Sequence, residues 1–167
     1  VNSLSEAFAQ ASLISFKFNF RGVDGSQGEF DQGVGEQEDV DAAISFVTEV
    51  READSRRIGL AGYSAGAGFA LPIGFKDARI KALAAISPPL PIFDFGFLKD
   101  CLKPKLLISG GKDNFTPISR FLEFCQSLPE TKEYDSIGMA VSVFGGYESI
   151  LAAKVAAFFT KVLKYRI

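Results

Sequence analysis

The amino-acid sequence predicts an α/β fold in which helices cover both faces of a mostly parallel sheet. The first observation behind this prediction is that strand-like and helix-like segments alternate along the chain without an internal repeat. The second is that residues 80–86 and 105–109 form apolar runs, which are typical of parallel strands buried on both faces. The third is that polar or glycine-rich loops follow the predicted strands, where sheets of this class gather their functional groups.

Each predicted strand has either an alternating pattern or a short apolar run. In residues 12–20 the apolar side chains of Ile14, Phe16 and Phe18 alternate with polar ones. The other predicted strands occupy residues 56–62, 80–86, 105–109 and 132–137. The strand at 56–62 leads into a glycine-flanked serine, and the strand at 105–109 leads into a Gly-Gly-Lys-Asp loop.

The predicted helices carry apolar residues at helical spacing. In residues 36–51 this stripe contains Val40, Ala43, Ile44 and Val47. The helix at 118–128 starts just inside Pro117, a residue that is favoured in the first turn. The remaining helices are predicted at residues 1–11, 65–75, 93–101 (short) and 147–165.

Composition excludes several classes of protein. Hydrophobic residues make up 47% of the 167 residues, and 17 of them are Phe, which indicates one globular domain over residues 1–167. Lys and Arg number 18 against 20 Asp and Glu without a long run of either sign, so we expect neither nucleic acid nor a membrane surface as a partner. With no signal peptide or bilayer-length apolar run, and with Cys101 and Cys125 expected as free thiols, a cytoplasmic location is predicted.

The segment Gly62-Tyr63-Ser64-Ala65-Gly66 follows a predicted strand and precedes a small-residue helix. This is the context of a G-x-S-x-G nucleophile elbow, in which a sharp turn exposes the serine hydroxyl. We expect both glycines to be required because a side chain at either position would collide with neighbouring backbone. Ser64 is therefore the candidate nucleophile and the Ala65 amide a candidate oxyanion donor. The alternative interpretation is an ordinary glycine-rich turn between a strand and a helix.

Other candidate residues also follow predicted strands. Asp113 lies beyond a buried strand and is interpreted as a catalytic carboxylate, with a turn-capping aspartate as the alternative. Arg21 is a candidate for the substrate pocket, or else pairs with the acidic loop around Glu29 and Asp31. Tyr63 and Ser87 are further pocket candidates. No cluster of Cys, His or Asp has the spacing of metal ligands, so we predict no metal and no cofactor.

Three motifs resemble the α/β-hydrolase superfamily, and within it the small predicted hydrolases related to dienelactone hydrolase. The first is Phe18-Asn19-Phe20-Arg21-Gly22-Val23 with the loop at 26–31, the second is the elbow, and the third is Gly110-Gly111-Lys112-Asp113 with Pro117. The resemblance covers nearly the whole chain. It implies an α/β-hydrolase fold with Ser64 as nucleophile and Asp113 as the carboxylate that orients a histidine.

The chain departs from that family in two ways. It contains no histidine, and Val141 stands near the position where the family places one, with an alignment uncertain by one residue. The family also has strands before the helix at 1–11; one lies centrally between the strands at 12–20 and 56–62, and the loop after it supplies the second oxyanion amide. We therefore expect a domain that is N-terminally incomplete relative to the family and lacks its first strands.

Two functions remain open from the sequence. The first is a serine hydrolase of ester or similar acyl substrates, impaired because nothing obvious takes the proton from Ser64. The second is a catalytically inactive homologue that binds a small molecule or a protein partner. The expected ligand in the first case is a small-molecule acyl substrate, and the sequence says nothing of the oligomeric state.

Overall fold

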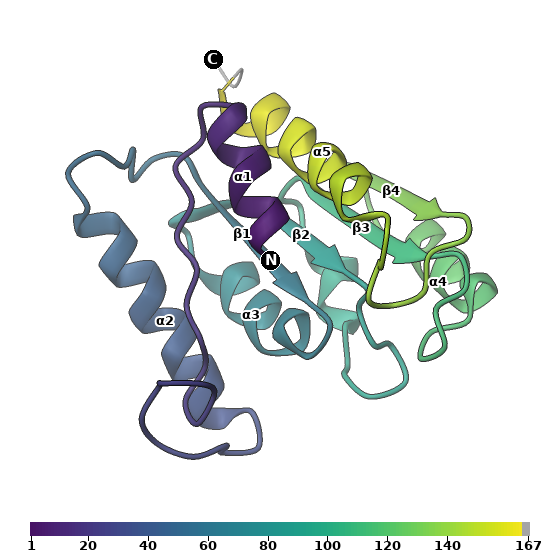
Figure 1. Ribbon diagram of the computed structural model, residues 1–167, viewed down its shortest axis with the longest axis horizontal. Coiled ribbons are helices and arrows are strands. Elements are labelled where there is room, and N and C mark those ends of the chain that lie inside the picture. Colours follow the sequence, from purple (N-terminus) through teal and green to yellow (C-terminus); the bar gives the residue numbers. More distant parts are fainter. Residues whose placement is uncertain (165–167) are drawn as a thin grey trace.

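The computed structural model describes residues 1–164 of the chain, and its centre is a parallel sheet of four strands (Figure 1). The strands are β1 (Ile58–Tyr63), β2 (Ile80–Ile86), β3 (Lys105–Gly110) and β4 (Lys132–Ile137), and they lie side by side in chain order. Tyr63 is paired with Ile86, Ile86 with Ile108, and Gly110 with Ile137. The strands therefore end close together, and the loops that follow them lie next to one another at the carboxyl-terminal end of the sheet.

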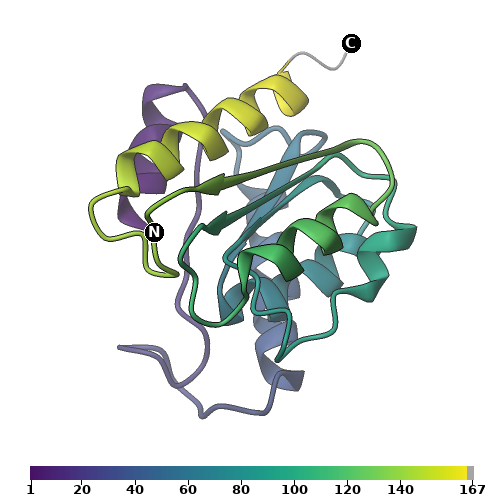
Figure 2. The same ribbon diagram turned by 90° about the vertical axis from the view of Figure 1, so that its right-hand side faces the viewer.

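Helices cover both faces of the sheet (Figures 1 and 2). On one face lie α1 (Asn2–Gln10) and α5 (Glu148–Phe159), which continues into the π-helical turn η2 (Thr160–Lys164). On the other lie α2 (Val34–Glu49), α3 (Ala65–Lys76), α4 (Ile118–Gln126) and the short 3-10 helix η1 (Gly96–Asp100). The layered architecture predicted from the alternation of strands and helices is confirmed.

The side chains of β2 divide between two hydrophobic cores. Leu83 and Ala85 pack with α3 and α4, whereas Ala84 and Ile86 pack with α5. Strands β2 and β3 are buried on both faces, which explains why their sequences are apolar runs rather than alternating patterns. Strand β1 is only partly buried and pairs with β2 alone within the described residues.

The strand predicted at residues 12–20 is wrong. This segment is extended but is paired with no strand, and within residues 1–164 the backbone N–H groups of residues 14–20 donate no hydrogen bond. Its phenylalanines pack on helices instead: the Phe16 ring lies 5.0 Å from that of Phe46 in α2, and the Phe20 ring 5.5 Å from that of Phe69 in α3. The alternating pattern therefore reflects an extended backbone with aromatic packing and not membership of the sheet.

The other elements match the prediction in type. Strands β2 and β4 also match it in their bounds, whereas the ends of the remaining elements are shifted. The helix expected at 36–51 begins at Val34, because Gly33 has a φ of 95° and its N–H donates to the carboxylate of Glu36 at 2.7 Å. The short helix expected at 93–101 is only η1. The terminal helix expected at 147–165 is α5 followed by η2, and Tyr165 lies outside the described residues.

Candidate active site

The elbow places Ser64 between β1 and α3 in a strained conformation. Ser64 has φ 52° and ψ −125°, a combination that L-residues rarely adopt away from functional turns. Its N–H donates to the carbonyl of Ile86 at 2.8 Å, and the N–H of Ser87 donates to the carbonyl of Ile108 at 2.7 Å. These two bonds extend the pairing of the sheet to the residues just beyond β1 and β2. They hold Ser64 and Ser87 at the carboxyl-terminal end of the sheet, which we call the edge of the sheet at the site.

Glycine is required sterically at one of the two positions of the elbow. A Cβ on Gly62 would lie 2.4 Å from the Cα of Ala67, which no real side chain tolerates. A Cβ on Gly66 would instead lie 3.7 Å from the ring of Phe20, an ordinary contact distance. The expectation that both glycines are sterically required is therefore right for Gly62 and wrong for Gly66.

The first turn of α3 offers a backbone donor beside Ser64. Ala65 is exposed, and its N–H has no acceptor among the residues that the structure describes. Free N–H groups at a helix start favour negative charge. The Ala65 amide can therefore donate to an oxyanion that forms on an acyl group held at Ser64.

Asp113 follows β3 and is 8% exposed. Its Oδ1 accepts hydrogen bonds from the N–H groups of Phe115 at 2.8 Å and Thr116 at 3.1 Å, as in a turn-capping aspartate. Its Oδ2 has a long contact of 3.5 Å with the hydroxyl of Ser109. One carboxylate oxygen thus fixes the loop. The other makes only the long contact with Ser109, so it can accept a hydrogen bond from a further group at the carboxyl-terminal end of the sheet.

Thr116 joins the loops that follow β2 and β3. Its hydroxyl donates to the carbonyl of Pro88 at 2.9 Å and accepts from the N–H of Leu90 at 3.2 Å, and the residue is 1% exposed. Ser87, just before Pro88, is 3% exposed with a φ of 43°, and its hydroxyl has no partner in the described part of the chain. Buried hydroxyls without partners are uncommon in proteins.

Residues 138–146 form the loop between β4 and α5, and this loop is packed closely against the Asp113 loop. A Cβ on Gly110 would lie 2.3 Å from the carbonyl oxygen of Ala140, so only glycine permits the approach. The N–H of Lys112 donates to the same carbonyl at 2.9 Å. On its other side, the loop receives a hydrogen bond of 2.5 Å from the hydroxyl of Tyr63 to the carbonyl of Ser142. Val141 and Ser142 therefore lie between the elbow and the Asp113 loop.

Tyr63 is half-buried, and its environment disfavours the charged form of its phenol. Burial raises the pKa of the Tyr63 hydroxyl, and the negative charge of Asp113 raises it further. The hydroxyl is therefore protonated near neutral pH and acts as a donor. In the structure the Tyr63 hydroxyl is bonded to loop 138–146. The prediction that Tyr63 lines a substrate pocket stays a prediction.

Arg21 is paired with acidic side chains of α2. Its guanidinium donates to both oxygens of Asp39, with a shortest distance of 2.8 Å, and to Glu38 at 3.2 Å. The paired carboxylates raise the pKa of Arg21, and the guanidinium lowers the pKa of Asp39. The partners suggested by the sequence, Glu29 and Asp31, are not those that the structure shows. A role of Arg21 in a substrate pocket stays a prediction.

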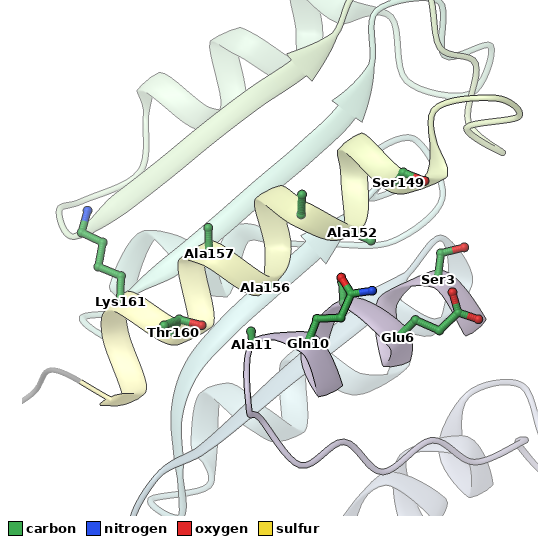
Figure 3. A pocket seen from close by; sticks show the side chains of 12 residues that line it. Ser3, Glu6, Gln10, Ala11, Ser149, Ala152, Ala156, Ala157, Thr160 and Lys161 are labelled. Carbon is green, nitrogen blue, oxygen red and sulfur yellow. The ribbon is translucent and has the colours of Figure 1, made fainter.

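A groove of about 690 Å³ lies between α1 and α5 (Figure 3). Its walls carry Ser3, Glu6 and Gln10 from α1 and small residues such as Ala152 and Ala156 from α5. None of the candidate residues Ser64, Ser87 and Asp113 lines it. Within residues 1–164 the structure shows no group of three Cys, Asp or Glu side chains that could hold a metal ion, and no helix long and apolar enough to cross a bilayer.

Several contacts at this edge had no signal in the sequence. The bond between Tyr63 and Ser142 joins residues 79 positions apart, and neither residue type predicts it. Nor does the sequence indicate that the Thr116 hydroxyl donates one hydrogen bond and accepts another, because a threonine shortly after an Asp is common in turns. A partial signal existed for Gly110 and Gly111, since a glycine pair after a buried strand often marks a close approach of backbone.

Comparison with known proteins identifies the family. A sequence model described as X-Pro dipeptidyl-peptidase (S15 family) matches residues 6–100, more than half of the chain. A solved α/β serine hydrolase homologue from Coxiella burnetii is 30% identical, with a TM-score of 0.84 over 94% of this chain and 74% of that one. The chain belongs to this S15 family and is an α/β hydrolase. The predicted fold class is thereby confirmed.

Two further relatives have the same character. A putative α/β hydrolase from Agrobacterium tumefaciens is 27% identical, with a TM-score of 0.88 over 98% of this chain and 77% of that one. An uncharacterized protein from Rickettsia prowazekii is 29% identical over 154 residues, which is 90% of this chain. The chain spans only 63% of the length of that curated relative. The narrower relation to dienelactone hydrolase stays a prediction.

Proposed function

We propose that this α/β hydrolase acts on esters or similar acyl compounds of small-molecule size, with Ser64 as nucleophile. The Ser64 hydroxyl would attack the acyl carbon and the Ala65 amide would stabilise the oxyanion. The proton of Ser64 would pass to the departing alcohol through solvent water, and a second water would then cleave the acyl–Ser64 ester, releasing the acid and restoring the hydroxyl. The observation that carries the proposal is the strained backbone of Ser64 at the start of α3, with a φ of 52° and a neighbouring free N–H. Asp113 would orient a base placed above the edge of the sheet.

The chain offers no histidine to serve as that base. Loop 138–146 brings Val141 and Ser142 to the place between the elbow and the Asp113 loop, but neither side chain removes a proton at neutral pH. Loss of the base costs a serine hydrolase several orders of magnitude in rate. We therefore expect slow turnover by the polypeptide with this sequence.

The test compares the protein with Ser64→Ala and Val141→His variants, using p-nitrophenyl acetate and butyrate and a fluorophosphonate probe. We expect the probe to label Ser64 slowly, and Val141→His to raise Ser64-dependent hydrolysis by about 10²–10⁴-fold, the usual contribution of a positioned base. A Ser142→His variant is the matched neighbour and covers an alignment shifted by one residue. Hydrolysis that persists unchanged in Ser64→Ala would contradict the assignment of the nucleophile.

The absence of histidine also favours a second function, that of an inactive homologue which binds a small molecule through the same edge. The probe distinguishes the two. If Ser64 is labelled in neither the unaltered protein nor the histidine variants, the nucleophile is not competent and binding is the better description.

A further inference from the structure

Four large apolar side chains are exposed around the candidate active site. Met139 and Val143 are 61% and 68% exposed, Val141 is 37% exposed, and Phe115 beside Asp113 is 59% exposed. Three of them alternate along loop 138–146, and the fourth belongs to the loop that is hydrogen-bonded to it. We call these four residues, Phe115, Met139, Val141 and Val143, the apolar rim.

The loop that carries most of the apolar rim is held at several points. Phe144 is 1% exposed and has a φ of 53°, so it is a buried anchor in a conformation that the surrounding contacts must maintain. The hydroxyl of Tyr63 donates to the carbonyl of Ser142, and the N–H of Lys112 donates to the carbonyl of Ala140 at 2.9 Å. The exposure of Met139 and Val143 is therefore set by a fixed backbone.

Exposed apolar side chains gathered at one place mark a surface that binds something apolar. Burial of each methylene group tightens a complex by roughly fourfold. No rim residue carries a charge, and the nearby Asp113 is buried with its Oδ1 bonded to backbone. The exposed charge of the adjoining loop is that of Lys112, whose long side chain can stay in water while its backbone N–H is bonded to Ala140. The surface thus suits an uncharged hydrocarbon group. Most of the rim lies on the loop that is hydrogen-bonded to Tyr63, the residue before Ser64, so a group bound there lies on the side of the molecule that carries the elbow.

We propose that the apolar rim binds the hydrocarbon chain of a neutral ester whose acyl carbon lies at Ser64. This inference rests on the proposed function and adds the substrate class, that is, esters with a medium or long chain over those with a short one. Two other occupants, a protein partner and a lipid surface, would cover the same side chains without making the reaction at Ser64 depend on chain length.

The experiment measures the rate at which Ser64 is labelled by a decyl and by an ethyl fluorophosphonate, both below their micellar concentrations. We expect the decyl probe to react faster, and the ratio of the two rates to fall about tenfold in Met139→Ser/Val143→Ser, as for the loss of about two buried methylene groups. The matched control is Val34→Ser/Leu102→Ser, which removes apolar groups that are 65% and 79% exposed on other elements and should keep the original ratio.

A second measurement separates this inference from the proposed function. Ethyl decanoate is titrated into the Ser64→Ala protein while the methyl signals of Met139 and Val143 are followed by NMR. Saturable shifts at these methyl groups support the rim even if no probe labels Ser64, in which case only the hydrolase assignment fails. Equal rates for the two probes, or a ratio that the rim variant leaves unchanged, overturn the inference. So does decanoate binding that shifts neither methyl group, or rim-dependent attachment to lipid vesicles without any preference for chain length.

Discussion

The hydroxyl of Tyr63 donates a hydrogen bond of 2.5 Å to the backbone carbonyl of Ser142, across 79 residues of sequence. Because Tyr63 immediately precedes Ser64, this bond ties the loop between β4 and α5 to the elbow. The ring of Tyr63 also lies 6.5 Å from that of Phe144, the buried anchor of the same loop. The position of loop 138–146 is thus coupled to the strand that carries the candidate nucleophile.

Replacing Tyr63 by Phe should loosen loop 138–146 while leaving the elbow intact. The variant keeps the ring contact with Phe144 and loses only the hydrogen bond, for which we expect a loss of about 1 kcal/mol in the free energy of unfolding. Hydrogen exchange of the amides in residues 138–146 is the measurement, with Tyr134→Phe on β4 as control. Unchanged exchange in this loop would contradict the coupling.

The two glycines of the elbow should respond differently to alanine. Gly62→Ala places a methyl group 2.4 Å from the Cα of Ala67, and we expect a loss of about 1–3 kcal/mol from overpacking. Gly66→Ala has room at 3.7 Å and lies in α3, so it should be neutral or stabilise by about 0.5–1 kcal/mol. Urea unfolding of both variants checks the contrast. A similar loss in both would show that the elbow is constrained in another way.

Thr116 and Ser87 should also differ, although both are buried hydroxyl residues in the loops that follow β3 and β2. Thr116→Val removes the hydroxyl that bonds both the carbonyl of Pro88 and the N–H of Leu90, and leaves these two groups with only their bond to each other at 2.9 Å; this should cost about 1–3 kcal/mol. Ser87→Ala removes a hydroxyl that has no partner within residues 1–164, so stability should stay the same or rise. Thermal unfolding of the two variants measures the difference. A large loss for Ser87→Ala would reveal an interaction that binds this hydroxyl in solution.

Glu36 should make the stability of the fold depend on pH. Burial disfavours its charge, but the backbone N–H groups of Asp31 and Gly33 outweigh this and lower its pKa below the ordinary value. A lowered pKa in the folded state means that the ionised form stabilises the fold. This stabilisation is complete above the ordinary glutamate pKa of about 4.3 and disappears as the pH falls through the folded value.

Glu36→Gln should therefore lower the unfolding temperature at pH 7, and the difference from the unaltered protein should shrink toward pH 3. Glu38→Gln is the matched control, because its side chain lies in the same helix and is 70% exposed. A difference that is as large at pH 3 as at pH 7 would mean that the charge of Glu36 is not what stabilises the start of α2.

The fold could be predicted from the sequence where local pattern and tertiary structure agree. The bounds of β2 and β4 were predicted residue by residue, since polar or turn residues flank short strands there. The prediction of a strand at residues 12–20 was wrong because an alternating pattern indicates an extended backbone but does not indicate whether a neighbouring strand exists. That information belongs to the assembled sheet and not to the segment. The single-domain organisation over residues 1–167 stays a prediction.

The candidate site was predictable in its parts but not in its connections. Gly62 before Ser64 and the glycines before Asp113 follow from the steric demands of a sharp turn and a close approach, which the sequence records directly. The pairing of Arg21 with Asp39 does not, because an arginine can reach any of several acidic residues and only the packing of α2 decides which one. Contacts between distant loops, such as that of Tyr63 with Ser142, depend on the whole fold.

The open backbone of residues 14–20 has a practical consequence for the purified protein. Residues 14–20 are extended, their N–H groups have no acceptor within residues 1–164, and they carry apolar side chains such as Ile14 and Phe16, so the segment is a template for ordered aggregation. The sequence of β1, the outermost strand on one side of the sheet, contains no charged residue that would oppose such pairing. We expect the protein to aggregate faster as its concentration rises, and the precipitates to bind amyloid dyes. A lysine in place of Ile14 should keep the protein in solution, as charged side chains do on the sheet edges of other proteins.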